Sequence, residues 1–184
     1  MHVTSPLLLT LPTYDDKGHV NAVVEAPKGS LAKRKYDTNF GIFTVSRALP
    51  VGISYPYDWG FIPTTEGPDG DPLDVLILHE GSTFPGIVIP CHPLGLIKMD
   101  EEDKKGRRRR NDRIIVTPIW QDCLGDLQGS SDVSKAMRKE IEQFFLNTVF
   151  FSSKNARVLG WKGGKKAASA IEAGRIAYKA KQKN

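Results

Sequence analysis

Short hydrophobic runs separated by turn-forming residues occupy the first two thirds of the chain, a pattern typical of β-strands. The runs that we predict to form strands are 20–26, 40–45, 73–78, 86–91, 94–99 and 113–119. The run at 73–78 is hydrophobic on both faces, so this strand should be buried on both sides. A series of such short strands predicts a small closed or nearly closed barrel.

The pattern changes in the C-terminal third, where hydrophobic residues recur every three or four positions, as on an amphipathic helix. A first helix is expected to begin with Asp132 as its N-cap, and a second to run over residues 164–181. The hydrophobic stripe of the first helix consists of Val133, Met137, Ile141, Phe144 and Thr148. No linker or repeat divides the 184 residues, so we predict a single α+β domain over residues 1–184.

Residues 50–63 carry aromatic side chains at alternate positions, namely Tyr55, Tyr57, Trp59 and Phe61. Prolines and glycines within this segment exclude a helix. Alternating aromatic rings can stack on nucleic-acid bases. In a chain with no other aromatic ladder they more often line a core or a cleft, and we favour that interpretation.

The net charge of +5 permits an anionic partner, from a nucleic acid to a small phosphate compound. Much of the positive charge lies in residues 104–110 and in the C-terminal third. The basic run 104–110 has acidic neighbours on both sides, including Asp103 and Asp112. We therefore interpret it as a solvated hairpin tip, and not as a nucleic-acid surface.

Cys91 and Cys123 occur in unrelated contexts without CxxC spacing, which indicates a reducing compartment and no zinc site. The hydrophobic run 7–11 is too short to span a bilayer and lacks the flanks of a signal peptide. We expect a cytoplasmic protein without a membrane partner.

Asp69, Asp71 and Asp74 stand at the start of the buried strand 73–78. Carboxylates crowded beside a core tend to become neutral unless a cation stabilises their charge. Oxygen ligands of this kind suit Mg²⁺ or another hard cation, although Asp-Gly-Asp is also a common turn sequence. A calcium loop of the EF-hand type is excluded, because Leu73 and Asp74 occupy positions that need an oxygen ligand and a glycine.

Two runs carry a resemblance to a known family: Tyr55–Ile62, with the sequence YPYDWGFI, and Asp69–Val75, with the sequence DGDPLDV. They resemble the soluble family I inorganic pyrophosphatases, whose signature is D-x-D-P-x-D. The resemblance covers nearly the whole chain. Its further matches are Glu25-x-Pro27, Lys35-Tyr36, Arg47, Cys91-x-Pro93-Leu94-Gly95 and Val158-Leu159-Gly160-Trp161.

The resemblance implies an OB-like, five-stranded closed barrel flanked by two main C-terminal helices. It also implies Mg²⁺-dependent hydrolysis of inorganic pyrophosphate to two phosphates by a metal-activated water, with several Mg²⁺ ions in each active site. The expected assembly is a homo-oligomer, which in bacterial members is commonly a hexamer. Magnesium would neutralise the substrate oxygens and supply an activated water near neutral pH.

Roles carried over from the family fall into three groups. The catalytic residues would be Asp71, which orients or activates water, and Glu25. The substrate-binding residues would be Lys35, Arg47, Tyr55, Trp59 and Arg113. The metal ligands would be Asp69, Asp71, Asp74 and Asp112. Asn111 competes with Asp112 for its position, and Asp100 and Glu101 are further possible ligands.

Several positions depart from the family pattern. Trp59 stands where a phosphate-binding tyrosine is usual, Thr148-Val149 where Tyr-Lys is usual, and Asp37 where glutamate is usual. We expect weaker substrate binding, which Lys154, Arg157 or Lys162 could offset. The alternatives are a catalytically weakened or silent relative of the family and, less favoured, a basic OB-like nucleic-acid-binding protein.

Overall fold

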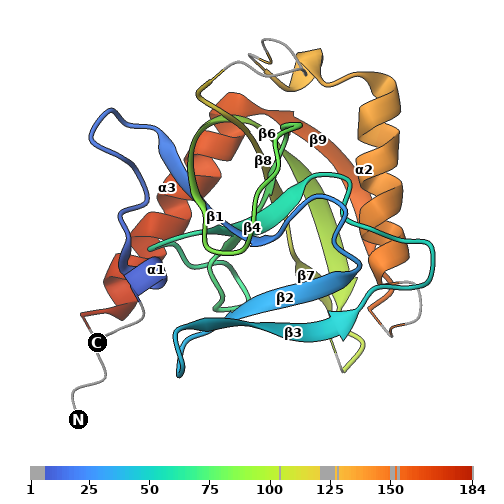
Figure 1. The fold of residues 1–184 in the computed structure, drawn as a ribbon, viewed down its shortest axis with the longest axis horizontal. Helices are drawn as coiled ribbons and strands as arrows, with labels where there is room; N and C mark the ends of the chain where they lie inside the picture. The colour runs from blue at the N-terminus through green and yellow to red at the C-terminus, as the bar shows by residue number, and fades with distance from the viewer. Residues whose placement is uncertain are drawn as a thin grey trace.

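The computed structural model describes residues 7–103, 105–120, 127, 129–149, 152 and 154–183, and at its centre five strands are hydrogen-bonded in a ring (Figure 1). In order around the ring they are β1 (Val20–Ala26), β4 (Asp58–Ile62), β5 (Leu73–Ile77), β8 (Arg113–Pro118) and β6 (Val88–Glu102), which pairs again with β1. Within the ring, β5 and β8 pair in parallel and the other pairs are antiparallel. This arrangement confirms the mainly-β, closed five-stranded core expected from the sequence.

Shorter elements surround the ring. The strands β7 (Arg108–Arg110) and β9 (Arg157–Gly163) both pair with β6. The hairpin of β2 (Ala32–Asp37) and β3 (Ile42–Ala48) forms a separate two-stranded sheet. A helical turn, α1 (Leu7–Thr10), and a 3₁₀ turn, η1 (Ser130–Asp132), complete this set.

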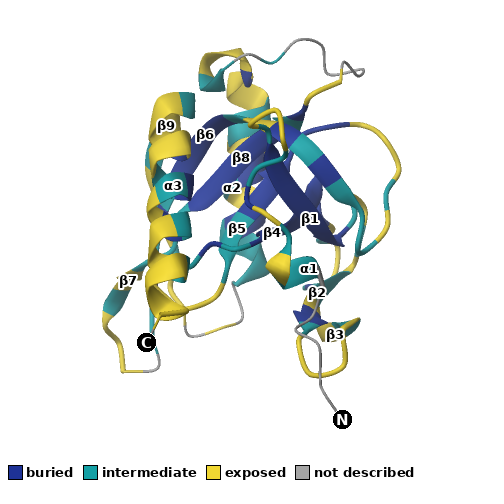
Figure 2. Cartoon of the chain, turned by 90° about the vertical axis from the view of Figure 1, so that its left-hand side faces the viewer, coloured by how far each residue is buried: buried dark blue, intermediate teal, exposed yellow. Residues whose placement is uncertain are grey.

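Two main helices flank the ring on opposite sides, α2 (Lys135–Thr148) and α3 (Gly164–Lys181) (Figure 1). Ile141, Phe144 and Phe145 of α2 belong to the core cluster that includes Trp59. Ala167 and Ile171 of α3 belong to a second core cluster, together with residues of the ring strands. Figure 2 shows α3 exposed on its outer side, with buried strands behind it. Both helices therefore bury one stripe against the ring, as their periodicity predicts.

The long strand β6 differs from the two strands that we predicted around Pro93. Pro93 lacks an amide hydrogen, and the register between β6 and β8 shifts between Pro93 and Gly95. Pairing with β8 resumes after this irregularity, so the strand continues. A side chain at Gly95 would lie 2.5 Å from the Lys162 carbonyl oxygen of β9, which shows how closely the two strands approach.

Three further expectations are corrected. Residues 32–37, for which the sequence predicted no strand, form β2, because pairing with β3 provides hydrogen bonds that the hydrophobic pattern does not reveal. The strands β4, β7 and β9 were not expected. The first helix begins at Lys135 and not at Asp132, since Ser134 is its N-cap and accepts a hydrogen bond from the Met137 amide at 3.2 Å.

The aromatic segment is confirmed as core wall, with Tyr55, Tyr57, Trp59 and Phe61 all buried. The basic run is ion-paired at the hairpin tip, where Arg107 and Arg109 both contact Asp103. Lys104 and Cys123 lie outside the described residues. None of the helices in the described part has the length and hydrophobicity needed to cross a membrane.

A prediction concerns Gly60 in β4, whose backbone passes very close to β1. A Cβ atom at Gly60 would lie 1.7 Å from the Val23 carbonyl oxygen, so Gly60→Ala must displace one strand of the ring. We expect a loss of at least about 3 kcal/mol in the free energy of unfolding, measured by thermal or chemical denaturation. Gly129→Ala is the control, because its nearest neighbouring atom would lie 3.7 Å away. Equal stability of the two variants would contradict the packing at Gly60.

Candidate active site

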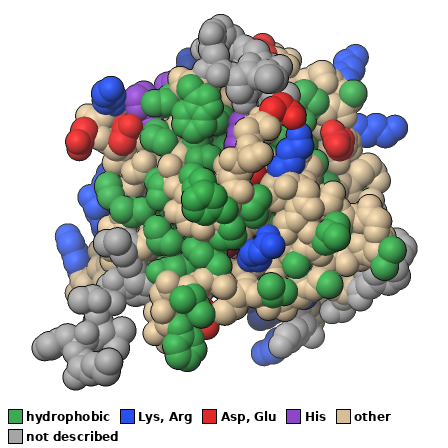
Figure 3. Space-filling view, in the orientation of Figure 1, with side chains coloured by type: hydrophobic (Ala, Val, Ile, Leu, Met, Phe, Trp, Pro, Cys, Tyr) green, Lys and Arg blue, Asp and Glu red, His purple; other side chains and the backbone are tan. Residues whose placement is uncertain are grey.

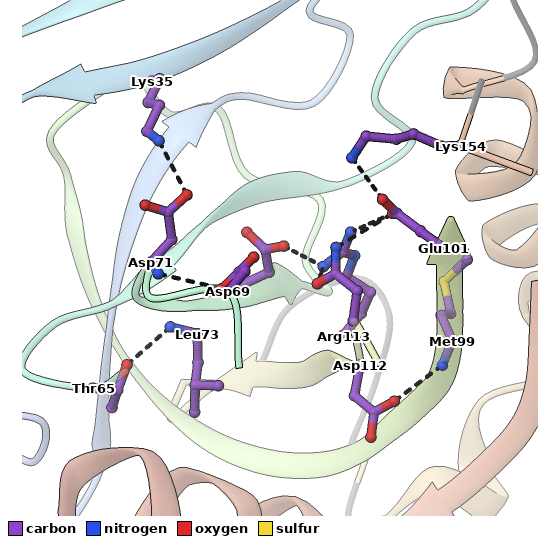
Figure 4. A network of polar contacts seen from close by, with 12 residues as sticks. Lys35, Thr65, Asp69, Asp71, Leu73, Met99, Glu101, Asp112, Arg113 and Lys154 are labelled. Carbon is purple, nitrogen blue, oxygen red and sulfur yellow. Dashed lines mark hydrogen bonds and ion pairs between the residues drawn. The ribbon is translucent and has the colours of Figure 1, made fainter. Parts of the chain in front are cut away.

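The acidic loop, residues 69–74, is a hydrogen-bonded turn that leads into β5. The Asp69 carboxylate accepts a hydrogen bond from the Asp71 amide at 3.3 Å. The Leu73 amide donates to Oγ1 of Thr65 at 3.0 Å, which fixes the loop where it enters the strand (Figure 4). The segment is therefore a turn, as one interpretation of the sequence predicted, and it also brings its acids to the mouth of a buried strand.

Asp71 and Asp74 each pair with a basic side chain from another element. Oδ2 of Asp71 lies 3.1 Å from Nζ of Lys35, and both side chains are more than half exposed. Asp74 accepts a hydrogen bond from Nη1 of Arg113. Because β5 and β8 pair in parallel with Val75 opposite Ile114, the preceding residues Asp74 and Arg113 lie next to each other.

A cavity of about 260 Å³ lies between the acidic loop and the β2–β3 hairpin. We call it the acidic cavity. Its charged lining residues are Glu25, Lys33, Lys35, Asp71 and Asp74. Carboxylates from β1 and from the acidic loop thus face two lysines from β2 across one small space.

Glu25 is the most deeply buried acid of the acidic cavity, at 8% exposure. Its Oε1 accepts a hydrogen bond from the Tyr36 amide at 3.0 Å. Burial is the main cause that raises the pKa of Glu25 to about 7. The Tyr36 amide, Lys33 and Lys35 oppose this shift, and the charge of Asp74 adds to it. A carboxyl group with this pKa can accept or release a proton near neutral pH.

A second cavity, of about 170 Å³, adjoins the first, and Lys33 lines both. We call it the basic cavity. Its charged lining residues are Lys33, Arg47, Glu101, Arg113 and Lys154. Arg47 is held at its rim, because Nη2 of Arg47 donates to the Thr148 carbonyl oxygen at 2.8 Å. An excess of cations over acids makes this cavity suitable for an anion.

Tyr55 and Trp59 supply part of the aromatic wall of the basic cavity. Burial raises the pKa of Tyr55 well above its ordinary value, so the hydroxyl keeps its proton. The Arg113 guanidinium lies over the Trp59 ring, 5.4 Å from the ring centre. Within the described part of the chain, Nε1 of Trp59 is buried without a hydrogen-bond partner. A buried donor without an acceptor is energetically unfavourable, so an acceptor that came within reach would be bound favourably.

Glu101 holds two cations at the basic cavity (Figure 4). Its Oε1 lies 3.1 Å from Nη2 of Arg113, and its Oε2 lies 2.6 Å from Nζ of Lys154. Burial alone would raise the pKa of Glu101, but the Lys154 hydrogen bond and the Arg113 charge lower it below its ordinary range. Arg113 therefore bridges Glu101 and Asp74, and it links the basic cavity to the acidic loop.

Asp112 lies on the other side of Arg113 from this network. Its Oδ1 accepts hydrogen bonds from the Met99 amide at 3.0 Å and from Nη2 of Arg110 at 2.5 Å. Asp112 lines a third cavity, of about 380 Å³, between the acidic loop and α3. Figure 4 shows its carboxylate directed toward Met99 of β6. The role of Asp112 as a metal ligand stays a prediction.

The acids of the site suit a hard cation in their chemistry, although in the described residues no group of three or more Asp, Glu, His or Cys side chains gathers closely enough to hold a metal ion. Asp69, Asp71 and Asp74 offer only oxygen atoms, as Mg²⁺ prefers. Burial raises the pKa of Asp74, whereas Arg113 and Lys33 lower it. A bound cation would likewise favour the charged carboxylate.

Most of the site residues named from the sequence line one of the two cavities, but the sequence gave no site role to Lys33. Lys33 and Lys35 are two positions apart on β2, and that spacing places both on one face of a strand. The signal was present, but it required β2 to be recognised as a strand. Of the cations considered for the basic cavity, Lys154 lines it, whereas Arg157 and Lys162 are not among its lining residues.

Comparisons with known proteins show which sequences and structures this chain is similar to. The family model described as inorganic pyrophosphatase matches residues 22–179. The crystal structure of inorganic pyrophosphatase from Thermus thermophilus has a TM-score of 0.84 and 35% identity, covering 94% of this chain and 98% of that one. The inorganic pyrophosphatase of Synechocystis is 32% identical, over 84% of this chain and 89% of its own.

A Helicobacter pylori inorganic pyrophosphatase structure also has a TM-score of 0.84, at 27% identity, and covers 92% of this chain and 99% of that one. Similarity of this extent in sequence and in fold spans both cavities and the acidic loop. The chain therefore belongs to the family I inorganic pyrophosphatases and is an inorganic pyrophosphatase (EC 3.6.1.1).

Proposed function

We propose that this enzyme hydrolyses pyrophosphate with Mg²⁺ at the acidic loop and with the substrate phosphates extending into the basic cavity. The observation that carries the proposal is the junction of an acidic and a basic cavity at Lys33. Pyrophosphate is a small anion with several charges, so its hydrolysis requires cations along both phosphate groups. The two cavities together provide cationic side chains and sites for metal ions.

The family implies a metal cofactor, and the acidic loop is where we place it. Asp69, Asp71 and Asp74 would hold the ions, with Asp112 as a further ligand. Bound there, Mg²⁺ would neutralise charge on the substrate and make water more acidic. Asp71 is more than half exposed, so its carboxylate can reach a water molecule and orient it for attack.

The substrate-binding group would consist of Lys35, Arg47, Tyr55, Trp59 and Arg113. Lys35 lies at the acidic cavity and the other four line the basic cavity. Tyr55 and Trp59 would donate neutral hydrogen bonds, and the unpartnered Nε1 of Trp59 supports this role. The arginines would supply fixed positive charge that does not depend on pH.

Glu25 is suited to move a proton during the reaction. It lines the same cavity as Asp71, and its pKa of about 7 lets it act as either acid or base at neutral pH. We propose that Glu25 accepts a proton released on the acidic side of the substrate.

A catalytically weakened enzyme is the alternative, and the end of α2 favours it. Thr148 and Val149 line the basic cavity. Oγ1 of Thr148 donates to the Phe145 carbonyl oxygen at 2.9 Å, and the Val149 side chain has no donor. A weakened enzyme would show a raised Michaelis constant with a smaller loss of turnover.

Self-association is a further part of the proposal. Several large hydrophobic side chains on or beside the β2–β3 hairpin are more than half exposed, namely Leu31, Phe40, Ile42 and Val45. Figure 3 shows hydrophobic side chains gathered on one face of the molecule. Surfaces of this kind commonly mark contacts between proteins. They support a homo-oligomer, while the number of subunits, including a hexamer, stays a prediction.

The direct test measures phosphate release from pyrophosphate by the purified protein, with millimolar Mg²⁺ and with EDTA in its place. We expect release that depends on Mg²⁺ and that Asp74→Asn abolishes, because this substitution removes a metal ligand while the side chain keeps its size. Circular dichroism should show that the variant remains folded.

Asp16→Asn is the matched control, since Asp16 is exposed and lies outside both cavities. It should retain the activity of the parent. Full activity in EDTA would contradict the role of the metal. Absence of activity in the parent at every Mg²⁺ concentration would favour a silent relative.

Trp59→Phe should weaken substrate binding, because it removes a donor that has no partner within the described residues from a side chain that lines the basic cavity. A hydrogen bond to a charged group is worth about 1.5–3 kcal/mol, so the Michaelis constant should rise roughly tenfold or more. Trp161→Phe is the control, since Nε1 of Trp161 already donates to Glu142 at 2.6 Å. Equal Michaelis constants for the two variants would remove Trp59 from the substrate site.

Glu25→Gln should change how stability depends on pH. The folded-state pKa of about 7 lies above the ordinary value of 4.5, so the unfolded chain loses its proton first as pH rises. Glu25 therefore makes the folded protein progressively less stable through this window, and glutamine does not. We subtract the free energy of unfolding of the parent from that of Glu25→Gln, both measured in EDTA. This difference should rise by roughly 1–3 kcal/mol between about pH 5 and pH 8.

Chemical denaturation at both pH values measures this difference. Glu140→Gln, at an exposed position of α2, serves as the control and should show no such trend. A constant difference between Glu25→Gln and the parent would show that the Glu25 carboxyl group titrates normally.

A further inference from the structure

The C-terminal end of α2 borders the basic cavity but offers it few hydrogen-bond donors. The Thr148 hydroxyl donates to the Phe145 carbonyl oxygen, and the Ser152 hydroxyl donates to the Val149 carbonyl oxygen at 2.7 Å. Val149 itself has no side-chain donor. These residues therefore line the cavity while their hydroxyl groups donate to the backbone. A ligand with phosphate oxygens would need hydrogen-bond donors from other parts of the cavity lining.

Lys154, in the segment between α2 and β9, brings a cation to the same cavity. Its ammonium group lies 2.6 Å from Oε2 of Glu101, and its side chain is 49% exposed. An ammonium group has three donors, and this contact uses one of them. The remaining donors can reach a ligand without breaking the contact with Glu101.

The backbone around Lys154 is anchored to the ring and is not a free loop end. The Glu102 amide of β6 donates to the Lys154 carbonyl oxygen at 2.6 Å. Nδ2 of Asn155 donates to Glu102 at 2.9 Å, and Nη1 of Arg108 donates to the Asn155 carbonyl oxygen at 2.5 Å. These three bonds fix the Cα position from which the lysine reaches the cavity, so less entropy is lost when it binds a ligand.

We propose that Lys154, oriented by the buried Glu101, is a phosphate-binding residue of the basic cavity and supplies the charged donor that the end of α2 lacks. Glu101 acts as the positioning residue, because it contacts both Lys154 and Arg113 and aligns them along one wall. This inference rests on the proposed function, since the ligand is a phosphate group of the substrate or product.

The experiment compares Lys154→Met with the parent in two measurements. The Michaelis constant for pyrophosphate should rise about tenfold or more, while turnover changes less, as for a contact made in both the ground and transition states. Inorganic phosphate should also raise the melting temperature of the parent more than that of Lys154→Met, because binding stabilises the folded state. The second measurement does not require turnover.

Two variants serve as controls. Arg157→Met removes an exposed cation of β9 that is not among the lining residues of the cavity, and it should behave like the parent. Lys154→Arg keeps the charge and should restore most of the phosphate effect, which would show that the effect depends on a cation at this position. Circular dichroism verifies that each variant is folded.

The outcomes separate this inference from the proposed function. A phosphate-dependent shift in melting temperature that Lys154→Met reduces supports the inference even if the parent hydrolyses no pyrophosphate. Equal shifts in Lys154→Met, Arg157→Met and the parent overturn it, even if the parent is active. A parent that shows neither a phosphate effect nor activity overturns both.

Discussion

The ion pairs of Arg113 with Asp74 and Glu101 connect the parts of this site. Parallel pairing of β5 and β8 places Asp74 and Arg113 side by side, and antiparallel pairing of β6 with β8 brings Glu101 to the same end of the ring. Three strands of the ring thus place opposite charges in contact. A guanidinium group keeps its charge at all working pH values, so this contact favours the charged form of both carboxylates.

The two cavities differ in the charged side chains that line them. The acidic cavity gathers carboxylates that are costly to keep charged without a cation, as the raised pKa of Glu25 shows. The basic cavity gathers cations around a small volume lined partly by aromatic rings. A substrate with two phosphate groups could occupy both cavities at once. Metal ions would neutralise the charge of one phosphate group in the acidic cavity, and basic side chains would bind the other in the basic cavity.

Departures from the family pattern lie mainly in the basic cavity. Trp59 has a buried donor that lacks a partner within the described residues, and Thr148 directs its hydroxyl to the backbone of α2. The acidic loop keeps all three aspartates of the signature. The changes are therefore expected to act on substrate affinity more than on metal binding, and Lys154 stands where it can offset part of the loss.

The sequence by itself determined the family, the closed mainly-β core, the two C-terminal helices and the acidic loop, because hydrophobic period and a specific motif are local properties. It missed β2, β7 and β9, because strands stabilised by hydrogen bonds to a partner strand need no hydrophobic signal of their own. It also missed β4, which lies in a segment interrupted by glycines and prolines, and it divided β6 at Pro93. Only the tertiary structure decided that Lys33 joins the two cavities and that Lys154, and not Arg157 or Lys162, lines the basic one. The direction of a side chain depends on strand register and on long-range contacts, which no local pattern encodes.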